Sequence, residues 1–164
     1  MVALVLALAG VGGATAVFYA ARAQHARDRR AIEPWLRVAA PAIADARRAI
    51  DVLGGGEGQL RAGNFRIGAD VEHARGELES VAKSLGRLRA PKVLEIVAAE
   101  ITTGLGFGIQ EALILERAVT SHVYGIDAQT AFRSARSSLD QSFGDGLKRL
   151  NDIRCRSGLG CSPL

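Results

Sequence analysis

The sequence predicts an all-α protein in which a single N-terminal transmembrane helix is followed by an antiparallel, up-down four-helix bundle. An uncharged apolar stretch opens the chain. Apolar residues then recur at steps of three and four, which places them on one face of a helix. The composition also favours helices, because Ala, Leu and Arg are abundant and aromatic residues make up only 5% of the chain.

The apolar stretch, residues 1–21, contains no charged side chain. A helix of that length spans about 31 Å, which matches the hydrocarbon thickness of a bilayer. Phe18 and Tyr19 lie at its downstream end, where aromatic side chains gather at membrane interfaces. A basic segment, residues 22–33, follows directly. The residues expected at the membrane interface are Phe18, Tyr19, Arg22, Arg27, Arg29 and Arg30.

Two other interpretations of residues 1–21 stay open. Ala21-Arg22-Ala23 has the small-x-small form of a signal-peptide cleavage site, but no basic residue precedes the apolar run as it does in signal peptides. A buried core helix is the other, and 21 residues without a charge argue against it. A retained single-pass anchor is therefore the prediction.

The sequence gives opposing indications of the side on which the remaining domain lies. Arginines after the span are typical of a cytoplasmic domain. Cys155 and Cys161, the only cysteines, flank a short glycine-containing loop and would form a disulfide in an oxidising compartment. We expect the extracytoplasmic side, and the cytoplasmic side stays open.

Four amphipathic stretches make up the predicted bundle, residues 34–156, and an irregular tail covers residues 157–164. The apolar stripes run from Ile32 to Leu53, Ile67 to Leu88, Leu94 to Val123 and Phe132 to Ile153. Short connections between long amphipathic helices favour antiparallel neighbours.

Glycine, proline and aspartate residues between these stretches predict where helices end and begin. Residues 54–58, with four glycines, are expected to form a loop, since glycine loses much entropy in a helix. Pro91 is expected to open the third bundle helix. Gly125 is expected to stop that helix, and Asp127 to cap the next one.

Two prolines complicate the first bundle helix. Pro34 and Pro41 each remove a backbone donor and are expected to kink or restart it. The membrane helix is then expected to end near Glu33.

Three glycines, Gly104, Gly106 and Gly108, interrupt the most apolar stretch. In a helix interior each costs about 1 kcal/mol relative to alanine. We expect close packing of this helix against Phe132 and Phe143 to compensate for that cost. A cavity or interaction groove at these glycines is the alternative.

No motif predicts catalysis, a cofactor or a metal. The run from Gly104 to Gly108 lacks the strand and the Lys-Ser or Lys-Thr pair of a phosphate-binding loop. His73 and Glu77 are expected to form a surface pair. Glu100 and Glu111 have apolar neighbours, yet a solvated flank is the expected position for both.

The predicted partners follow from the anchor and the charge. The net charge is +4, partly from the basic segment beside the anchor, and no basic face is interleaved with aromatic residues. We therefore expect a membrane and a protein partner or second copy of the chain, and no nucleic acid. The predicted function is that of a non-enzymatic, membrane-anchored interaction protein, an accessory or scaffold subunit of a cell-envelope complex. A sensor-like bundle that binds a ligand or lipid is the alternative.

Overall fold

The computed structural model describes residues 2–162, with side chains described from residue 23 onward. Within this part the chain forms four α-helices and one short 3-10 helix, and no strand. The elements are α1 (Val2–Arg61), α2 (Gly68–Arg87), η1 (Lys92–Leu94), α3 (Glu95–Ser121) and α4 (Ile126–Arg156). The predicted all-helical class is confirmed for the described residues.

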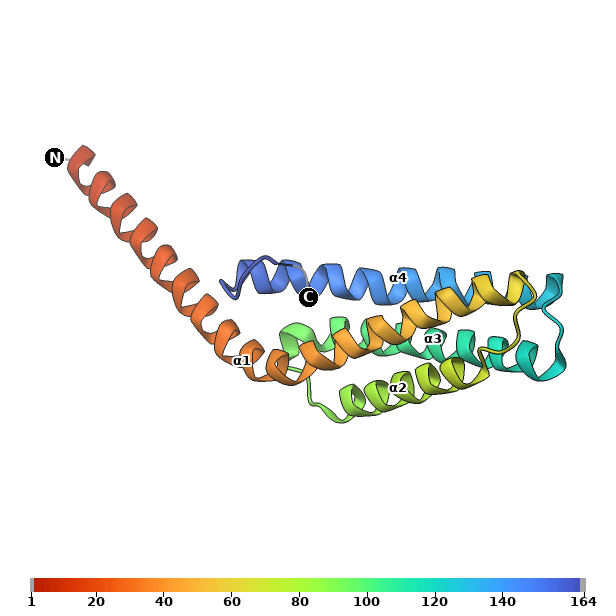
Figure 1. The fold of residues 1–164 in the computed structure, drawn as a ribbon. Coiled ribbons are helices and arrows are strands. Elements are labelled where there is room, and N and C mark those ends of the chain that lie inside the picture. Colours follow the sequence, from red (N-terminus) through yellow and green to blue (C-terminus); the bar gives the residue numbers. More distant parts are fainter. Residues whose placement is uncertain (1, 163–164) are drawn as a thin grey trace.

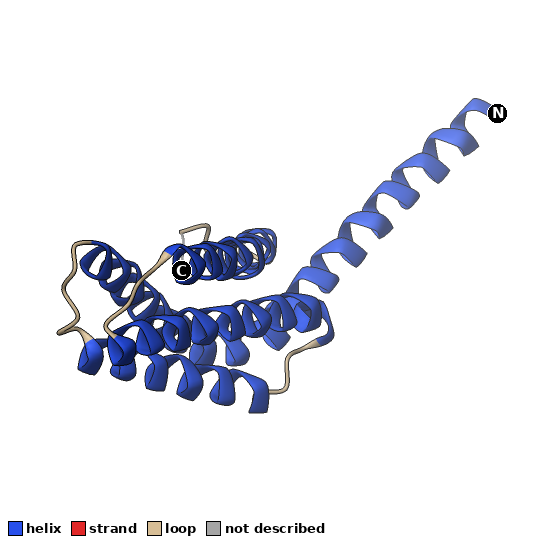
Figure 2. Ribbon diagram, turned by 90° about the vertical axis from the view of Figure 1, so that its right-hand side faces the viewer, coloured by secondary structure: helices blue, strands red, loops and turns tan. Residues whose placement is uncertain are grey.

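Figure 1 shows the bundle helices running in alternating directions, joined by short connections. α3 packs against all three other α-helices. The N-terminal part of α1 leaves the bundle and continues away from it as a helix (Figures 1 and 2). It leaves at the end where α4 terminates and α2 connects to α3, which we call the proximal end. The opposite end is the distal end.

The core consists mainly of the predicted apolar stripes. Ile43, Leu78, Leu105 and Leu139, one from each helix, are at most 1% exposed. Burial of such a face, rather than helix propensity, supplies most of the stability of helices in a bundle. Val123 is an exception to the predicted stripe, because α3 ends two residues earlier and leaves this side chain exposed.

The prediction of a loop at residues 54–58 is wrong. This segment continues α1 to Arg61, and the loop follows at residues 62–67. Leu53 and Leu60 are both buried in the core. Burying two leucines stabilises the helix by about 1.5–3 kcal/mol each, which offsets four glycines at about 1 kcal/mol each.

The two prolines lie inside α1, and the helix neither ends nor restarts at them. The predicted helix end near Glu33 is therefore wrong. Figure 1 shows α1 changing direction where it joins the bundle. Ile32 and Trp35 are buried there, so tertiary contacts hold the helix on both sides of Pro34 despite the lost backbone bond.

Three residues have different roles at helix ends from those predicted. α3 ends at Ser121 and not at Gly125, and its C-cap is His122, whose φ of 54° lies in the left-handed region. Gly125 is instead the N-cap of α4, and Asp127 lies in the first turn. Pro91 precedes η1 as its N-cap. The breaks between these helices nevertheless fall near the predicted positions.

Among the described side chains, one helix, Lys92–Ser121, is long and apolar enough to cross a membrane. This helix comprises η1 and α3, whose apolar face is buried against the rest of the bundle. Core packing accounts for the same composition. The predicted anchor, residues 1–21, lies outside the described side chains, together with Phe18, Tyr19 and Arg22, and stays a prediction.

α3 and α4 approach closely at glycines on both helices. A Cβ atom at Gly104 would lie 2.6 Å from Cβ of Phe143 and 2.7 Å from its backbone nitrogen. A Cβ atom at Gly146 of α4 would lie 2.9 Å from Cγ1 of Ile101. Each glycine therefore provides space that the other helix occupies.

The other two glycines of α3 differ from one another. A Cβ atom at Gly108 would lie 3.1 Å from Cδ1 of Leu78 on α2, whereas one at Gly106 would meet no heavy atom within 4 Å. Packing therefore explains Gly104 and Gly108 and leaves Gly106 without a packing reason.

Candidate functional site: the groove between α1 and α2

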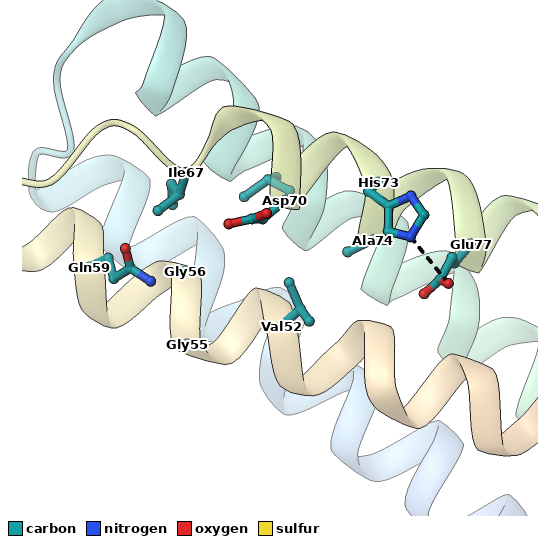
Figure 3. Close-up of a pocket in the computed structure, with 10 residues that line it drawn as sticks. Val52, Gly55, Gly56, Gln59, Ile67, Asp70, His73, Ala74 and Glu77 are labelled. Atoms are coloured by element: carbon teal, nitrogen blue, oxygen red, sulfur yellow. Dashed lines mark ion pairs between the residues drawn. The ribbon is translucent and has the colours of Figure 1, made fainter.

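An open groove of about 320 Å³ lies between α1 and α2 (Figure 3). The α1 wall includes Gly55 and Gly56, from the glycine segment that continues the helix. The apolar lining residues are Val52, Ile67, Val71 and Ala74. The polar lining residues are Gln59, Asp70, His73 and Glu77.

Packing within the chain explains only part of the glycine segment. A Cβ atom at Gly56 would lie 3.3 Å from Cδ1 of Ile67, and one at Gly54 would lie 3.5 Å from Nη2 of Arg136. A Cβ atom at Gly55 or Gly58 would meet no heavy atom within 4 Å. Gly55 therefore leaves the backbone of α1 uncovered at the groove, where another molecule can approach it closely.

The rim of the groove carries carboxylates. Figure 3 shows the side chains of Asp70 and Glu77 on α2 directed toward the space between the helices. His73 Nε2 lies 3.4 Å from Glu77 Oε1, so these residues form the predicted surface pair. Gln59 accepts a hydrogen bond of 2.8 Å from Asn64. An apolar floor beside carboxylates is suited to an apolar group next to a cation.

Sequence reasoning missed this groove because it placed residues 54–58 in a loop. The available signal was the spacing of Leu53 and Leu60, which are seven residues apart and share one helix face. That spacing predicts a helix through the glycines.

A buried ion pair joins α3 to α4. Glu111 is 0% exposed, and its Oε1 lies 2.6 Å from Nε of Arg136. The guanidinium of Arg136 lies over the ring of Phe132, with its Cζ 5.4 Å from the ring centroid. The expectation of a solvated flank is therefore wrong for Glu111, because α4 covers it.

Burial dominates the electrostatics of this carboxyl group. Desolvation raises the pKa of Glu111 to about 7, although Arg136 lowers it and Asp140 adds a small increase. Neither carboxylate oxygen forms a well-aligned hydrogen bond within the described structure. Glu111 has no solvent access through which to reach a substrate, so we assign it to the architecture of the α3–α4 contact.

Glu100 lies closer to the surface than Glu111. Its side chain is 26% exposed and pairs with Arg149 Nη1 at 2.9 Å. This pair joins α3 to α4 near the proximal end, so Glu100 is also more buried than a solvated flank.

Cys155 and Cys161 form a disulfide at the proximal end, with their Cα atoms 4.6 Å apart. The bond closes the turn that follows α4. Disulfides persist in oxidising compartments and are rare in the cytosol of mesophiles. The bond thus supports an extracytoplasmic position for the bundle.

We expect Cys155 and Cys161 to resist a membrane-impermeant maleimide in intact cells and to react once a reductant has been added. The reason is that a bonded cysteine has no thiolate to attack the reagent. The reductant must also be membrane-impermeant, so that labelling reports the exposed side of the membrane. The variant with Ser at both positions is the blank. Labelling that requires cell lysis would place the bundle on the cytoplasmic side.

The described side chains include no group of three or more His, Cys, Asp and Glu residues that is able to hold a metal ion. His73 pairs with Glu77, and the ring of His122 lies 5.5 Å from that of Phe65. Arg27, Arg29 and Arg30, three of the predicted membrane-interface residues, are exposed on α1.

Comparison with known proteins gives no family assignment. No protein-family model, curated protein or solved structure matches the chain.

Proposed function

We propose that this chain is a membrane-anchored interaction protein, an accessory or scaffold subunit of a cell-envelope complex, that receives a partner segment in the groove between α1 and α2. The observation that carries the proposal is the uncovered backbone at Gly55. A glycine in a helix interior costs about 1 kcal/mol relative to alanine. Contacts within the chain do not require glycine at position 55. A partner that packs directly on this backbone would require it.

The chemistry of the groove indicates what the partner presents. Its floor accepts an apolar side chain, and the carboxylates of Asp70 and Glu77 favour an adjacent Lys or Arg. Both carboxylates lie on α2, one on each side of His73. A partner helix or strand with an apolar and a basic residue on one face satisfies both features.

Continuity of α1 supports the anchored arrangement. One helix includes the uncharged residues 2–21 and the groove wall at Gly55. With a rise of about 1.5 Å per residue, the groove lies about 50 Å along the helix from the proposed span. A partner held in the groove is then positioned at a set distance from the bilayer.

Filling the groove is expected to release the partner. We expect Gly55→Leu to dissociate an assembly that is larger than the 17.3 kDa chain when the protein is extracted in mild detergent. Gly58→Leu is the matched control, because Gly58 also meets open space but does not line the groove. Analytical ultracentrifugation with detergent-matched density measures the protein mass.

Two results would contradict the proposal. A wild-type protein found only as the free monomer excludes a stable complex. An assembly that persists equally in both variants excludes the groove as the contact. The anchor has its own test, because alkaline carbonate extracts a peripheral protein from membranes and leaves an integral one behind.

Binding of a small molecule is the second candidate. The groove volume of about 320 Å³ lies at the lower end of the range for ligand pockets. Its lining favours an apolar cation. A monomeric protein from which native mass spectrometry releases one bound small molecule, lost in Gly55→Leu, supports this candidate over the first.

A further inference from the structure

Three segments that are far apart in the sequence meet at the proximal end (Figure 1). They are residues 25–37 of α1, residues 83–96 from the end of α2 to the start of α3, and residues 149–162 at the end of α4. A hollow of about 190 Å³ is lined by residues of all three segments, among them Asp28, Val93 and Arg156.

The proximal end and the rest of the bundle carry net charges of opposite sign. The three proximal segments together contain eleven Lys and Arg residues against four Asp and Glu residues, a net charge of +7. The rest of the bundle, residues 38–82 and 97–148, contains nine basic and thirteen acidic residues, a net charge of −4. The positive charge of the chain is thus concentrated at the end from which the N-terminal helix departs.

Two basic side chains of this end are available to a partner. Arg89 and Lys92, in the connection from α2 to α3, are exposed and have no ion-pair partner among the described side chains. Beside them Val93 is 41% exposed and Ile96 is 68% exposed. Exposed apolar residues among cations are typical of surfaces that contact membranes.

We propose that the proximal end of the bundle docks on the headgroups of a bilayer that contains anionic lipid. The proposal rests on the anchored function above, because the N-terminal part of α1, which contains the proposed span, leaves the bundle at this end and brings it to the membrane surface. Arg89 and Lys92 then contact lipid phosphates, while Val93 and Ile96 enter the interfacial layer. This contact fixes the orientation of the bundle and leaves the distal end away from the headgroups.

The exposed Val93 and Ile96 among the cations, together with the apolar segment of residues 1–21, favour a lipid surface over the other polyanion, nucleic acid. Each Lys or Arg near an anionic bilayer strengthens association by about fivefold. The acidic remainder of the bundle, net −4, is repelled by the same surface. Contact through the proximal end alone brings the basic residues to the lipid and keeps the acidic residues away from it.

Hydrogen–deuterium exchange of the full chain in lipid nanodiscs tests the proposal. One preparation contains only phosphatidylcholine, and the other contains 30% phosphatidylglycerol by design. We expect amide exchange in residues 88–96 to slow roughly fivefold or more with the anionic lipid at low salt. Residues 62–67, at the distal end, serve as the internal reference and should not change.

Matched charge reversals sharpen the test. Arg89→Glu with Lys92→Glu removes two proximal cations and should abolish the slowing by anionic lipid. Arg66→Glu with Arg117→Glu changes the net charge equally at exposed positions outside the proximal segments and should retain it. Circular dichroism of each variant verifies that the helices are intact.

The outcomes separate this inference from the proposed function. Equal exchange of residues 88–96 in both lipids overturns headgroup docking, and so does equal loss of slowing in both double variants. A chain that fails to co-purify with either nanodisc overturns the membrane anchor itself. Co-purification with no slowing of amide exchange in residues 88–96 is consistent with the membrane anchor and overturns only the docked orientation.

Discussion

Gly104→Ala is expected to lower the free energy of unfolding by about 2 kcal/mol. The added Cβ atom would lie 2.6 Å from Cβ of Phe143 and 2.7 Å from its backbone nitrogen. A backbone atom cannot rotate away as a side-chain end can, so α3 and α4 must separate. The loss of packing along this contact exceeds the gain in helix propensity from alanine, which is at most about 1 kcal/mol.

Gly106→Ala is the control on the same helix. A Cβ atom there meets no heavy atom within 4 Å, so the substitution should stabilise the protein by about 0.5–1 kcal/mol. Urea unfolding of both variants, followed by circular dichroism in one detergent, measures the difference. Destabilisation of equal size at the two positions would show that close approach at Phe143 is not the cause.

Arg136→Met is expected to destabilise the protein by about 3–5 kcal/mol at pH 8. Methionine has a similar reach without a charge, and it removes the cation that lowers the pKa of Glu111. At pH 8 the buried carboxyl group must then either stay ionised without a partner or take up a proton, and both cost stability. The loss should be much smaller at pH 5, where the carboxyl group is protonated and costs less to bury. Combining Arg136→Met with Glu111→Leu removes both charges and should recover most of the stability. A loss that is the same at both pH values would contradict this account.

The raised pKa of Glu111 also predicts how the stability of the wild-type protein depends on pH. Its value in the folded state, about 7, lies above the ordinary value of 4.5, so the folded state binds this proton more tightly than the unfolded state. Stability is therefore lost as pH rises through that interval. At 1.36 kcal/mol per pKa unit the contribution is about 3 kcal/mol. Glu111→Gln should lack it, and unfolding of both proteins from pH 4 to 8 measures the difference.

Local sequence signals correctly predicted that the described part of the chain is helical. They did not predict the positions of several helix ends. The stripe from Phe132 to Leu150 requires only that apolar residues recur every three or four positions. Residues 54–58 show the limit of such signals, because helix propensity alone predicts a loop there. Burial of Leu53 and Leu60 against other helices reverses that outcome, and their neighbours come from distant parts of the chain.

The candidate site and the close contact of α3 with α4 depend on tertiary structure even more than the helix ends do. The groove needs α2 beside Gly55, and the glycine contact needs Gly146 on α4 to complement Gly104 on α3. Burial of Glu111 likewise depends on α4 and not on the apolar neighbours of Glu111 in the sequence. Pairwise contacts of this kind have no local signature.

The sequence by itself determined that the described chain is all-helical, where its apolar faces lie and that its first 21 residues carry no charge, because each of these is a property of residues adjacent along the chain. Only the tertiary structure decided that α1 continues through residues 54–58, that a groove opens at Gly55 and that three basic segments gather at one end. Those features arise from residues that the fold brings together across long separations in the chain, where burial and charge are shared among several helices.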